Sequence, residues 1–467
     1  MTRTPRQIAV VGAGPAGIYA ADILAELAPD DRIDLFERLP APYGLVRYGV
    51  SPDHPRIKKI IDSLHVMLES ERVRLLCDVD VGSDVTVDEL RRAYDAVIVA
   101  TGAIKDAPLD IPGIELPGSF GAADFVSWYD GHPDVPRDWP LVAESVAVIG
   151  AGNVALDVAR MLIKHARTLA VTDISDDVAD GLAANPIRDL HLFARRGPAD
   201  VRFSPLELRE LGEQEDVDVI VDPAELEPDP HLERMTAQFA QRRVLVRTMR
   251  EWAALADGPR TATRRVHLHF RRAPAALLGR GRVEGLRVEH TVADELGRVR
   301  GSGVFEEHAV QAVYRAIGYA GSPLRGVPFD ASSSTIPHEA GAVLDEDGAR
   351  IPGLFTTGWI KRGPVGLIGS TKADARQTVD TLLADVSSGA GRPGGEEILR
   401  LLAERGRTPI GWRGWLRIDG AEQRLGAERG RARTKIVDRA ELVGLAREEE
   451  AAQSAGGQVL ATRVSTS

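Results

Sequence analysis

One pattern of apolar and polar positions occurs at two places in the chain. At each place a short apolar run leads into a glycine-rich turn, and apolar residues with helical spacing follow. The first place begins at Ile8 and reaches about Ala28, and the second begins at Ser145 and reaches about Ala166. A strand, a glycine-rich turn and a helix in this order predict the opening unit of a dinucleotide-binding fold.

The first turn has the sequence Gly12-Ala13-Gly14-Pro15-Ala16-Gly17. Gly12 permits the tight turn, Gly14 lets the backbone approach a pyrophosphate, and Gly17 lets the helix pack on the strand. The N–H groups at the start of the helix would then face the phosphates. The next apolar run, residues 32–37, ends in Glu37, at the spacing where such folds place a ribose ligand. We therefore expect Glu37 to bind a free 2′-hydroxyl, as carried by FAD or NAD.

The second turn has the sequence Gly150-Ala151-Gly152-Asn153-Val154-Ala155, with alanine at its third position. The strand after it, residues 189–194, is followed by Arg195 and Arg196 rather than by an acid. An acid would repel a 2′-phosphate, whereas two guanidinium groups bind one through charge-assisted hydrogen bonds. The second site therefore favours NADP over NAD, with two solvated arginines at a strand end as the alternative. Two units with opposite ribose chemistry predict two dinucleotides in one chain, and FAD with NADPH is the simplest pair.

The remaining patterns indicate an α/β fold with two Rossmann-like dinucleotide-binding domains, the NADP-binding domain inserted into the FAD-binding domain. Further strands are expected at residues 73–81, 96–103, 266–270, 283–288 and 313–319, and further helices from about Pro55, at 231–253 and at 370–385. Loop-like sequence after Pro108 suits a domain crossing. We expect residues 1–105 and 319–467 to form the FAD-binding domain and 106–318 the NADP-binding domain, with a disordered tail beyond about residue 450.

Three polar side chains outside the two turns are candidates for a site, each with an ordinary alternative. His54 lies in a Gly- and Pro-rich loop before a helix, where a histidine is more often solvated or capping than catalytic. Glu207 and Glu210 are three residues apart, so they lie on one side of a helix and are by default solvated.

Two other segments have features that suit a flavin or a protein partner. The glycine-lined loop at residues 353–369 leads into a helix, and amides near Leu367 and Ile368 suit the N1–C2=O edge of a reduced flavin. Trp359 in this loop either forms an aromatic wall of that site or packs in the core. On the predicted 231–253 helix one face carries three arginines, which form either a solvated face or a docking patch for an acidic partner. They are Arg243, Arg247 and Arg250.

Composition and charge exclude several classes of function. The chain of 467 residues has one cysteine, Cys77, which excludes an intramolecular disulfide, an iron–sulfur cluster held by four cysteines and a CxxC redox pair. The net charge of −11 argues against nucleic acid as the main partner. No stretch suits a membrane span, and Asp22 and Glu26 interrupt the apolar N-terminal stretch that a secretory signal would need. We therefore expect a cytoplasmic protein, and the sequence predicts no metal site.

Over about residues 6–440 the sequence resembles the adrenodoxin reductase family, most closely its bacterial NADPH-ferredoxin reductases of actinobacterial type. The motifs that carry the resemblance are GAGPAG with Glu37, PYGLVRYGVSPDHP, GNVALDVAR, ARRG, LELREL and TGWIKRGPVGLIGSTK. The resemblance implies that His54 and Glu210 are active-site residues beside the isoalloxazine ring. It implies that FAD is bound by Ala13, Glu37, Leu45, Val81, Trp359 and the amides of Gly366, Leu367 and Ile368. It implies that NADP is bound by Gly152, Asn153, Val154, Ala155, Arg195, Arg196, Glu207 and Gly366.

The activity implied by the resemblance is electron transfer from NADPH to a ferredoxin. Hydride passes from NADPH to FAD, and single electrons then pass to an acidic iron–sulfur ferredoxin. An FAD- and NADPH-dependent monooxygenase or diaphorase stays open, as does a noncatalytic NADP(H)-binding subunit. A disulfide reductase of similar architecture is excluded, because it needs a CxxC-type pair beside the flavin. His54 and Glu210 would position the nicotinamide and tune proton supply, since hydride transfer itself needs neither acid nor base.

Overall fold

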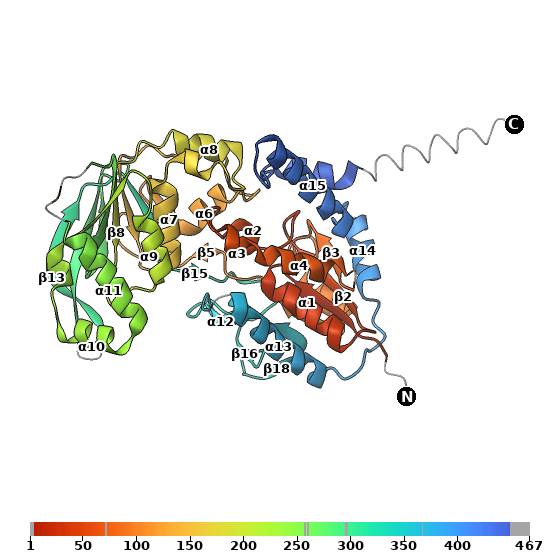
Figure 1. Cartoon of the computed structure of the whole chain (residues 1–467). Helices are drawn as coiled ribbons and strands as arrows, with labels where there is room; N and C mark the ends of the chain where they lie inside the picture. The colour runs from red at the N-terminus through yellow and green to blue at the C-terminus, as the bar shows by residue number, and fades with distance from the viewer. Residues whose placement is uncertain are drawn as a thin grey trace.

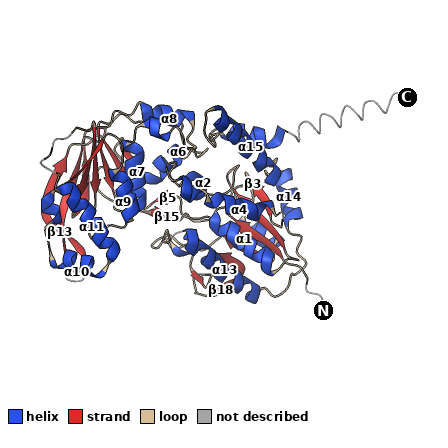
Figure 2. Ribbon diagram, in the orientation of Figure 1, coloured by secondary structure: helices blue, strands red, loops and turns tan. Residues whose placement is uncertain are grey.

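The computed structural model describes residues 4–70, 72–255, 258, 261–294, 298–366 and 368–448. Within these residues the chain forms an α/β fold with two Rossmann-like domains, each built on a mainly parallel sheet (Figures 1 and 2). The first sheet takes its strands from both ends of the chain, and the second takes its strands from the middle. No helix among the described residues is long and apolar enough to cross a bilayer.

The first sheet has the strand order β16-β17-β18-β4-β1-β2-β3 within the described residues. Its strands are β1 (Gln7–Val11), β2 (Arg32–Glu37), β3 (Arg74–Cys77), β4 (Ala96–Val99), β16 (His338–Glu339), β17 (Ala342–Leu344) and β18 (Arg350–Thr356). Strand alternation sends Ile8 and Val10 of β1 into one core and Ala9 and Val11 into another. The first core includes residues of α1 (Pro15–Leu27), α4 (Ile60–Glu69), α13 (Ile368–Asp385) and α15 (Trp412–Glu428). The second includes residues of α5 (Val87–Ala93) and α14 (Gly395–Glu404).

The second sheet has the strand order β6-β14-β7-β8-β10-β9, and all its described pairings are parallel. Its strands are β6 (Ser119–Gly121), β7 (Ser145–Ile149), β8 (Asp189–Phe193), β9 (Val217–Val221), β10 (Arg264–His269) and β14 (Ala312–Arg315). One face packs in a core with α6 (Ala122–Tyr129), α7 (Asn153–Ile163), α9 (Pro205–Gly212) and α11 (Ala240–Ala253). The other face packs on an antiparallel sheet formed by β11 (Arg272–Leu278), β12 (Gly285–Ala293) and β13 (Val299–His308).

The chain leaves and re-enters the first domain along two paired segments. Strand β5 (Lys105–Asp106) pairs antiparallel with β15 (Tyr319–Ala320), so the outgoing and returning chains lie side by side between the two sheets (Figure 1). The other helices are α2 (Leu45–Tyr48), α3 (Pro55–Lys58), α8 (Asp176–Ala183), α10 (Pro230–Gln238) and α12 (Trp359–Arg362). Two short 3-10 helices cover Ala166–Leu169 and Pro223–Leu226.

Several predicted element boundaries are wrong. The strand expected at 73–81 ends at Cys77, because Asp78 takes a φ of 59° and the chain leaves the strand conformation there. The helix expected at 231–253 is interrupted at Phe239, which separates α10 from α11. The segment expected as a loop before Pro55 contains the short helix α2. The sequence pattern does not predict strands β5, β6, β9, β11, β13, β16, β17 and β18, and the segment expected as a loop at 353–369 contains the end of β18 and helix α12. The expected disordered tail beyond residue 450 lies outside the described residues.

Candidate functional site

The first glycine turn joins the carboxyl end of β1 to the amino end of α1. Gly12 has a φ of 107°, and its N–H donates to the carbonyl oxygen of Phe36 at 2.8 Å. A Cβ on Gly17 would lie 1.9 Å from the carbonyl oxygen of Gly12, so the helix can approach the strand only with glycine there. Gly14 precedes α1 without a side-chain cap, and a Cβ on it would meet only Gly44, at 3.9 Å. Uncapped N–H groups beside two bare glycines make a cradle that fits a pyrophosphate.

Glu37 ends β2 beside this turn and is fixed by the backbone. Its carboxylate accepts hydrogen bonds from the N–H groups of Ala13, at 2.9 Å, and Leu39, at 3.0 Å. Burial raises the pKa of Glu37, and these hydrogen bonds act in the opposite direction. Thr101 follows β4 at the same edge of the sheet, and its buried Oγ1 has no hydrogen-bond partner among the described residues. A fixed carboxylate and a free hydroxyl at the carboxyl edge of the sheet fit the adenosine half of a dinucleotide.

The second turn repeats this arrangement between β7 and α7. The N–H of Gly150 donates to the carbonyl oxygen of Phe193 at 3.0 Å, and a Cβ on Gly150 would lie 2.1 Å from the carbonyl oxygen of Ala316. Ala155 is fully buried at the third position, where the first turn requires glycine. Asn153 begins α7, and its Oδ1 accepts the N–H of Ser204 at 3.1 Å. This hydrogen bond ties the start of α7 to the start of α9. Gly152 and Val154 lie on either side of Asn153 in the same turn.

Arg195 and Arg196 follow the carboxyl end of β8, near the second turn. Their backbone is held: Thr291 Oγ1 donates to the carbonyl oxygen of Arg195 at 2.7 Å, and the Arg271 N–H donates to that of Arg196 at 3.0 Å. Neither guanidinium forms an ion pair or a hydrogen bond with the described residues, and Arg195 is exposed. Two unpaired cations on a fixed backbone suit a ligand with a 2′-phosphate.

The structure brings His54 and Glu210 together across the two domains. His54 precedes α3 of the first domain, and Glu210 lies on α9 of the second. Nδ1 of His54 lies 3.9 Å from Oε2 of Glu210, and Nε2 lies 3.4 Å from Oε2 of Glu207. Nε2 also forms a 3.0 Å hydrogen bond with Oδ1 of Asp157 on α7. The candidate active-site pair therefore lies where the start of α3 meets helices α7 and α9.

Arg160 on α7 neutralises the carboxylates of this cluster. It is 1% exposed, and its guanidinium donates to Glu207 at 2.6 Å, to Asp157 at 2.5 Å and to Asp53 at 3.1 Å. Sequence reasoning missed Asp53, Asp157 and Arg160. The available signal was the GNVALDVAR motif, in which Asp157 and Arg160 are three residues apart and so share a helix face.

The protonation states in this cluster follow from its geometry. Burial alone would lower the pKa of His54, but the hydrogen bonds to Asp157 and Glu207 outweigh it and raise the pKa to about 10. Burial would raise the pKa of Glu207, but hydrogen bonds from His54 and Arg160 lower it. Glu210 is different, because burial raises its pKa, the charges of Arg160 and His54 oppose the change only in part, and no hydrogen bond from the described residues reaches its carboxylate. Glu210 is also 32% exposed in its side chain, so it is the member best able to exchange a proton with solvent.

The C-terminal loop predicted at 353–369 approaches the first turn. A Cβ on Gly358 would lie 2.6 Å from Cβ of Ala16, so the loop and α1 are in contact. Trp359 begins α12, is half-buried and stacks on Tyr319 with ring centroids 6.2 Å apart. Gly366 is exposed and has a φ of 93°. Leu367 lies outside the described residues, and Ile368 begins α13.

Leu45 and Val81 lie farther along the same domain. Leu45 begins α2 and is half-buried, next to Gly44, which faces the first turn. Val81 is 6% exposed and forms an isolated bridge with Val85. The structure thus places both in the first domain, Leu45 beside the turn and Val81 in the apolar core.

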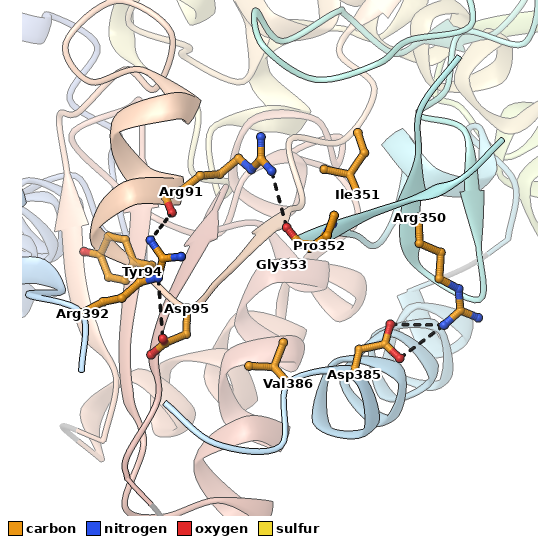
Figure 3. A pocket seen from close by; sticks show the side chains of 10 residues that line it. All are labelled: Arg91, Tyr94, Asp95, Arg350, Ile351, Pro352, Gly353, Asp385, Val386 and Arg392. Carbon is orange, nitrogen blue, oxygen red and sulfur yellow. Dashed lines mark hydrogen bonds and ion pairs between the residues drawn. The ribbon is translucent and has the colours of Figure 1, made fainter. Parts of the chain in front are cut away.

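A cavity of about 590 Å³ lies at the opposite edge of the first sheet (Figure 3). It lies at the amino ends of β4 and β18, whereas both predicted dinucleotide sites lie at carboxyl ends. Its arginines are engaged by neighbouring groups: Arg350 pairs with Asp385, and Arg392 with Asp95 (Figure 3). Ligands of open α/β sheets bind outside the carboxyl ends of the strands, so this cavity is not a dinucleotide site.

Comparison with known proteins places the chain among flavin-dependent reductases. Residues 6–190 match the family model described as pyridine nucleotide-disulphide oxidoreductase. The chain is 41% identical to the NADPH-ferredoxin reductase FprA of Mycobacterium leprae, over 93% of this chain and 97% of the relative. It is 38% identical to the human mitochondrial NADPH:adrenodoxin oxidoreductase, over 95% of this chain and 92% of the relative.

A solved structure gives the same result. The Mycobacterium tuberculosis FprA structure in complex with NADPH superposes with a TM-score of 0.87 at 38% identity, covering 95% of this chain and 99% of the other. The match to relatives at this identity extends over nearly the whole of both chains. The chain therefore belongs to the family of NADPH-ferredoxin and NADPH:adrenodoxin reductases.

Proposed function

We propose that this chain is an NADPH-ferredoxin reductase that uses FAD to pass electrons from NADPH to an iron–sulfur ferredoxin. The observation that carries the proposal is the contact of His54 with Glu210 across the two dinucleotide-binding domains, at 3.9 Å. Relatives about 40% identical over nearly the full length bear this name. A disulfide reductase is excluded by the single cysteine, Cys77, which is also buried.

The proposal assigns one dinucleotide to each domain. The first turn and Glu37, with Leu45, Val81, Trp359 and the loop around Gly366, would hold FAD. The second turn, Arg195, Arg196 and Glu207 would hold NADP(H). Residues 1–105 and 319–467 would form the FAD-binding domain and 106–318 the NADP-binding domain. The pairing of β5 with β15 supports these boundaries, because it lies where the chain passes from one sheet to the other.

The chain's own residues orient the reactants and control protons. FAD held in the first domain would supply an acceptor for the hydride of NADPH and a donor of single electrons, which is the chemistry that a one-electron carrier requires. Arg160 donates hydrogen bonds to the Asp53, Asp157 and Glu207 carboxylates, and the hydrogen bonds of Asp157 and Glu207 to His54 raise the pKa of the imidazole. The imidazolium is thereby held rigidly at the domain contact, where it can donate a hydrogen bond.

Glu210 is the proposed proton-exchanging group of the pair. Its raised pKa lets it hold a proton closer to neutral pH than an ordinary glutamate does, and it is partly open to solvent. Since hydride transfer needs no acid or base, the pair acts on orientation and on proton supply.

The proposed protein partner is an acidic iron–sulfur ferredoxin. The α11 arginine stripe, which consists of Arg243, Arg247 and Arg250, is exposed along one helix of the second domain. An exposed basic stripe attracts an acidic partner and speeds its encounter. A cytoplasmic location and the exclusion of nucleic acid as a partner remain predictions made from the sequence.

A visible spectrum followed by an NADPH titration tests the proposed function. Purified protein should show flavin absorption bands that NADPH bleaches, and added ferredoxin should then be reduced with the flavin acting catalytically. Colourless protein that fails to reduce ferricyanide with NADPH would instead support a noncatalytic NADP(H)-binding subunit. A protein that bleaches with NADPH, ignores ferredoxin and consumes oxygen together with an organic substrate would support a monooxygenase.

A further inference from the structure

Five of the 11 histidines of the chain gather between the two sheets of the second domain. His191 lies on β8, His267 and His269 on β10, His290 on β12 and His308 on β13. This layer is far along the chain from His54, and the proposed electron transfer does not use it. Imidazoles are the commonest metal ligands in proteins.

Strand alternation explains why the imidazoles share one layer. Leu190 and Leu192 of β8 pack in the core against the helices, so His191 points to the opposite face, toward the antiparallel sheet. In β10, Val266 and Leu268 pack in that same core, which turns His267 and His269 to the same face as His191. His267 is directly opposite His191 in the parallel pairing of the two strands.

Three of these imidazoles converge. One ligand nitrogen each from His191, His269 and His308 lies within 4.8 Å of the other two. Nδ1 of His191 and Nε2 of His269 are 3.1 Å apart, and the His269 and His308 ring centroids are 4.9 Å apart. In a tetrahedral zinc site with Zn–N bonds of about 2.0 Å, ligand nitrogens are roughly 3.3 Å apart. Small side-chain rotations would therefore bring the three nitrogens to bonding positions.

The hydrogen bonding of the three rings suits a metal ion. Nδ1 of His191 and Nε2 of His269 share one hydrogen bond at 3.1 Å, and neither nitrogen forms another hydrogen bond to the described residues. Nε2 of His308 is buried and makes no hydrogen bond to the described residues, although Oε1 of Glu306 lies 3.2 Å away.

A second group of possible metal ligands differs from the three imidazoles, because an arginine already forms hydrogen bonds to it. His54, Asp157 and Glu207 also place ligand atoms within 4.8 Å of one another. Arg160 fills that cluster with hydrogen bonds to Asp157 and Glu207, so its positive charge already satisfies the carboxylates. No cation of the described residues forms a hydrogen bond to the three converging imidazole nitrogens.

We propose that His191, His269 and His308 bind one divalent transition-metal ion of the Zn²⁺ type, with water as the fourth ligand. Three imidazoles with one further oxygen ligand form a tetrahedral site that suits Zn²⁺ and also accepts Co²⁺. The ion joins β8 and β10 of the parallel sheet to β13 of the antiparallel sheet. It therefore fastens the two layers of the second domain to each other, which goes beyond the sequence-based expectation of no metal site.

The test uses tag-free, flavin-loaded full-length protein that has been treated with a chelator and dialysed. Titration with Co²⁺ should give the absorption bands of a tetrahedral site at longer wavelengths than the flavin bands, saturating at one equivalent. Zn²⁺ should abolish these bands by competition, and calorimetry with Zn²⁺ should give the same stoichiometry. Zn²⁺ should also raise the melting temperature in a concentration-dependent way, because it binds the folded state.

Two ligand variants and one matched control locate the site. His191→Gln and His308→Gln should each weaken Zn²⁺ binding by more than about 100-fold, since loss of second-shell partners alone costs 10–100-fold. His231→Gln is the control, because His231 pairs with Asp200 outside the layer. It should bind Zn²⁺ as the unmodified protein does.

Binding that is absent from the unmodified protein, or equal in both ligand variants and the control, would overturn the proposal. If a ligand variant does not fold, the Co²⁺ spectrum and the shift in melting temperature of the unmodified protein still test whether the metal binds. Reduction of the flavin by NADPH is measured separately. A protein that binds no metal can therefore still be a reductase, and a protein that is not a reductase can still bind the metal.

Discussion

A single buried guanidinium, that of Arg160, holds the candidate active site together. It is 1% exposed and contacts carboxylates from the first domain and from two helices of the second. A buried charge is tolerated only when it is paired and hydrogen-bonded, so Arg160 and its carboxylates stabilise one another. His54 owes its raised pKa to hydrogen bonds with Asp157 and Glu207, two of the carboxylates that Arg160 contacts, so its chemistry is a property of the cluster.

Replacement of His54 by alanine should slow reduction of the bound flavin by NADPH by at least about 10-fold, because His54 positions the nicotinamide and a misplacement of about 1 Å can cost about 10²-fold in rate. Flavin content should not change, since His54 lies outside the first glycine turn. Stopped-flow absorbance measures the rate. The control is His165→Ala, which removes a different ion-paired histidine, one that lies in the second domain. Loss of flavin with unchanged kinetics would contradict the assignment.

The raised pKa of His54 also makes a prediction about stability. Its pKa is about 10 in the folded protein against 6.5 in a free imidazole, so the folded state gains stability from the proton. This contribution is complete below about pH 6.5 and is lost as the pH rises to about 10. The difference in unfolding free energy between the unmodified protein and His54→Gln should therefore shrink across this range. Urea unfolding at several pH values measures it, and a difference that grows with pH would refute the prediction.

The two arginines after β8 make a prediction about cofactor choice. Arg195→Ala combined with Arg196→Ala should raise the KM for NADPH by at least about 10-fold, because hydrogen bonds to charged groups contribute about 1.5–3 kcal/mol each. The KM for NADH should change little, since NADH lacks the 2′-phosphate. Arg188→Ala is the matched control, as Arg188 is an exposed arginine at the other end of the same strand. Equal effects on both nucleotides would overturn the phosphate assignment.

The two strand–turn–helix units differ in how closely the helix approaches the turn. In the first, α1 comes so near that a Cβ at Gly17 would lie 1.9 Å from the carbonyl oxygen of Gly12. In the second, the corresponding position is Ala155, whose Cβ is accommodated and fully buried. The same fold unit therefore tolerates a side chain in one domain and not in the other.

Gly17→Ala should lower the free energy of unfolding by about 2 kcal/mol or more and reduce the flavin content of the purified protein, because overpacking costs 1–3 kcal/mol and displaces the helix start. Chemical unfolding and the ratio of flavin to protein absorbance measure these effects. The reciprocal variant Ala155→Gly should cost only about 1 kcal/mol, the helix-propensity difference, and leave the flavin in place. A Gly17→Ala protein with full flavin content would show that the first turn does not hold FAD.

The two domains meet at the His54 cluster, and the α11 arginine stripe lies on the second of them, on the outer part of that domain (Figure 1). The chain has a net charge of −11, yet the α11 arginine stripe is exposed. A local basic surface on an acidic protein orients an acidic partner, because the rest of the molecule repels it. We therefore expect ferredoxin to approach the second domain along α11 (Figure 1).

Substitution of all three arginines of the α11 arginine stripe by alanine should lower kcat/KM for ferredoxin by about 10-fold at low salt, because the steering field is weakened. The salt dependence of the reaction should become shallower as well. Ferricyanide reduction should not change, since the stripe lies outside the cofactor sites. The control removes Arg298, Arg376 and Arg400, which are exposed and lie elsewhere. Equal loss in both triple variants would exclude docking at α11.

Local pattern was enough to predict the two strand–turn–helix units and the α/β class. The glycines of the two turns and the acid or arginines after the next strand depend on neighbours within about 45 residues, so the sequence displays them directly. Boundaries were less predictable, because the end of β3 at Cys77 depends on a turn at Asp78 that periodicity does not reveal. The family resemblance, rather than the spacing, pointed to His54 and Glu210.

The sequence by itself determined which residues could bind a 2′-hydroxyl or a 2′-phosphate, because that choice depends on the charge at one strand end. Tertiary structure alone decided which distant side chains meet. Packing of the two domains places His54 beside Glu210 and Arg160, and packing of two sheets places His308 beside His191. These contacts depend on strand order and on the packing of the two domains. Both involve residues far apart in the sequence, so they produce no periodic pattern along the chain.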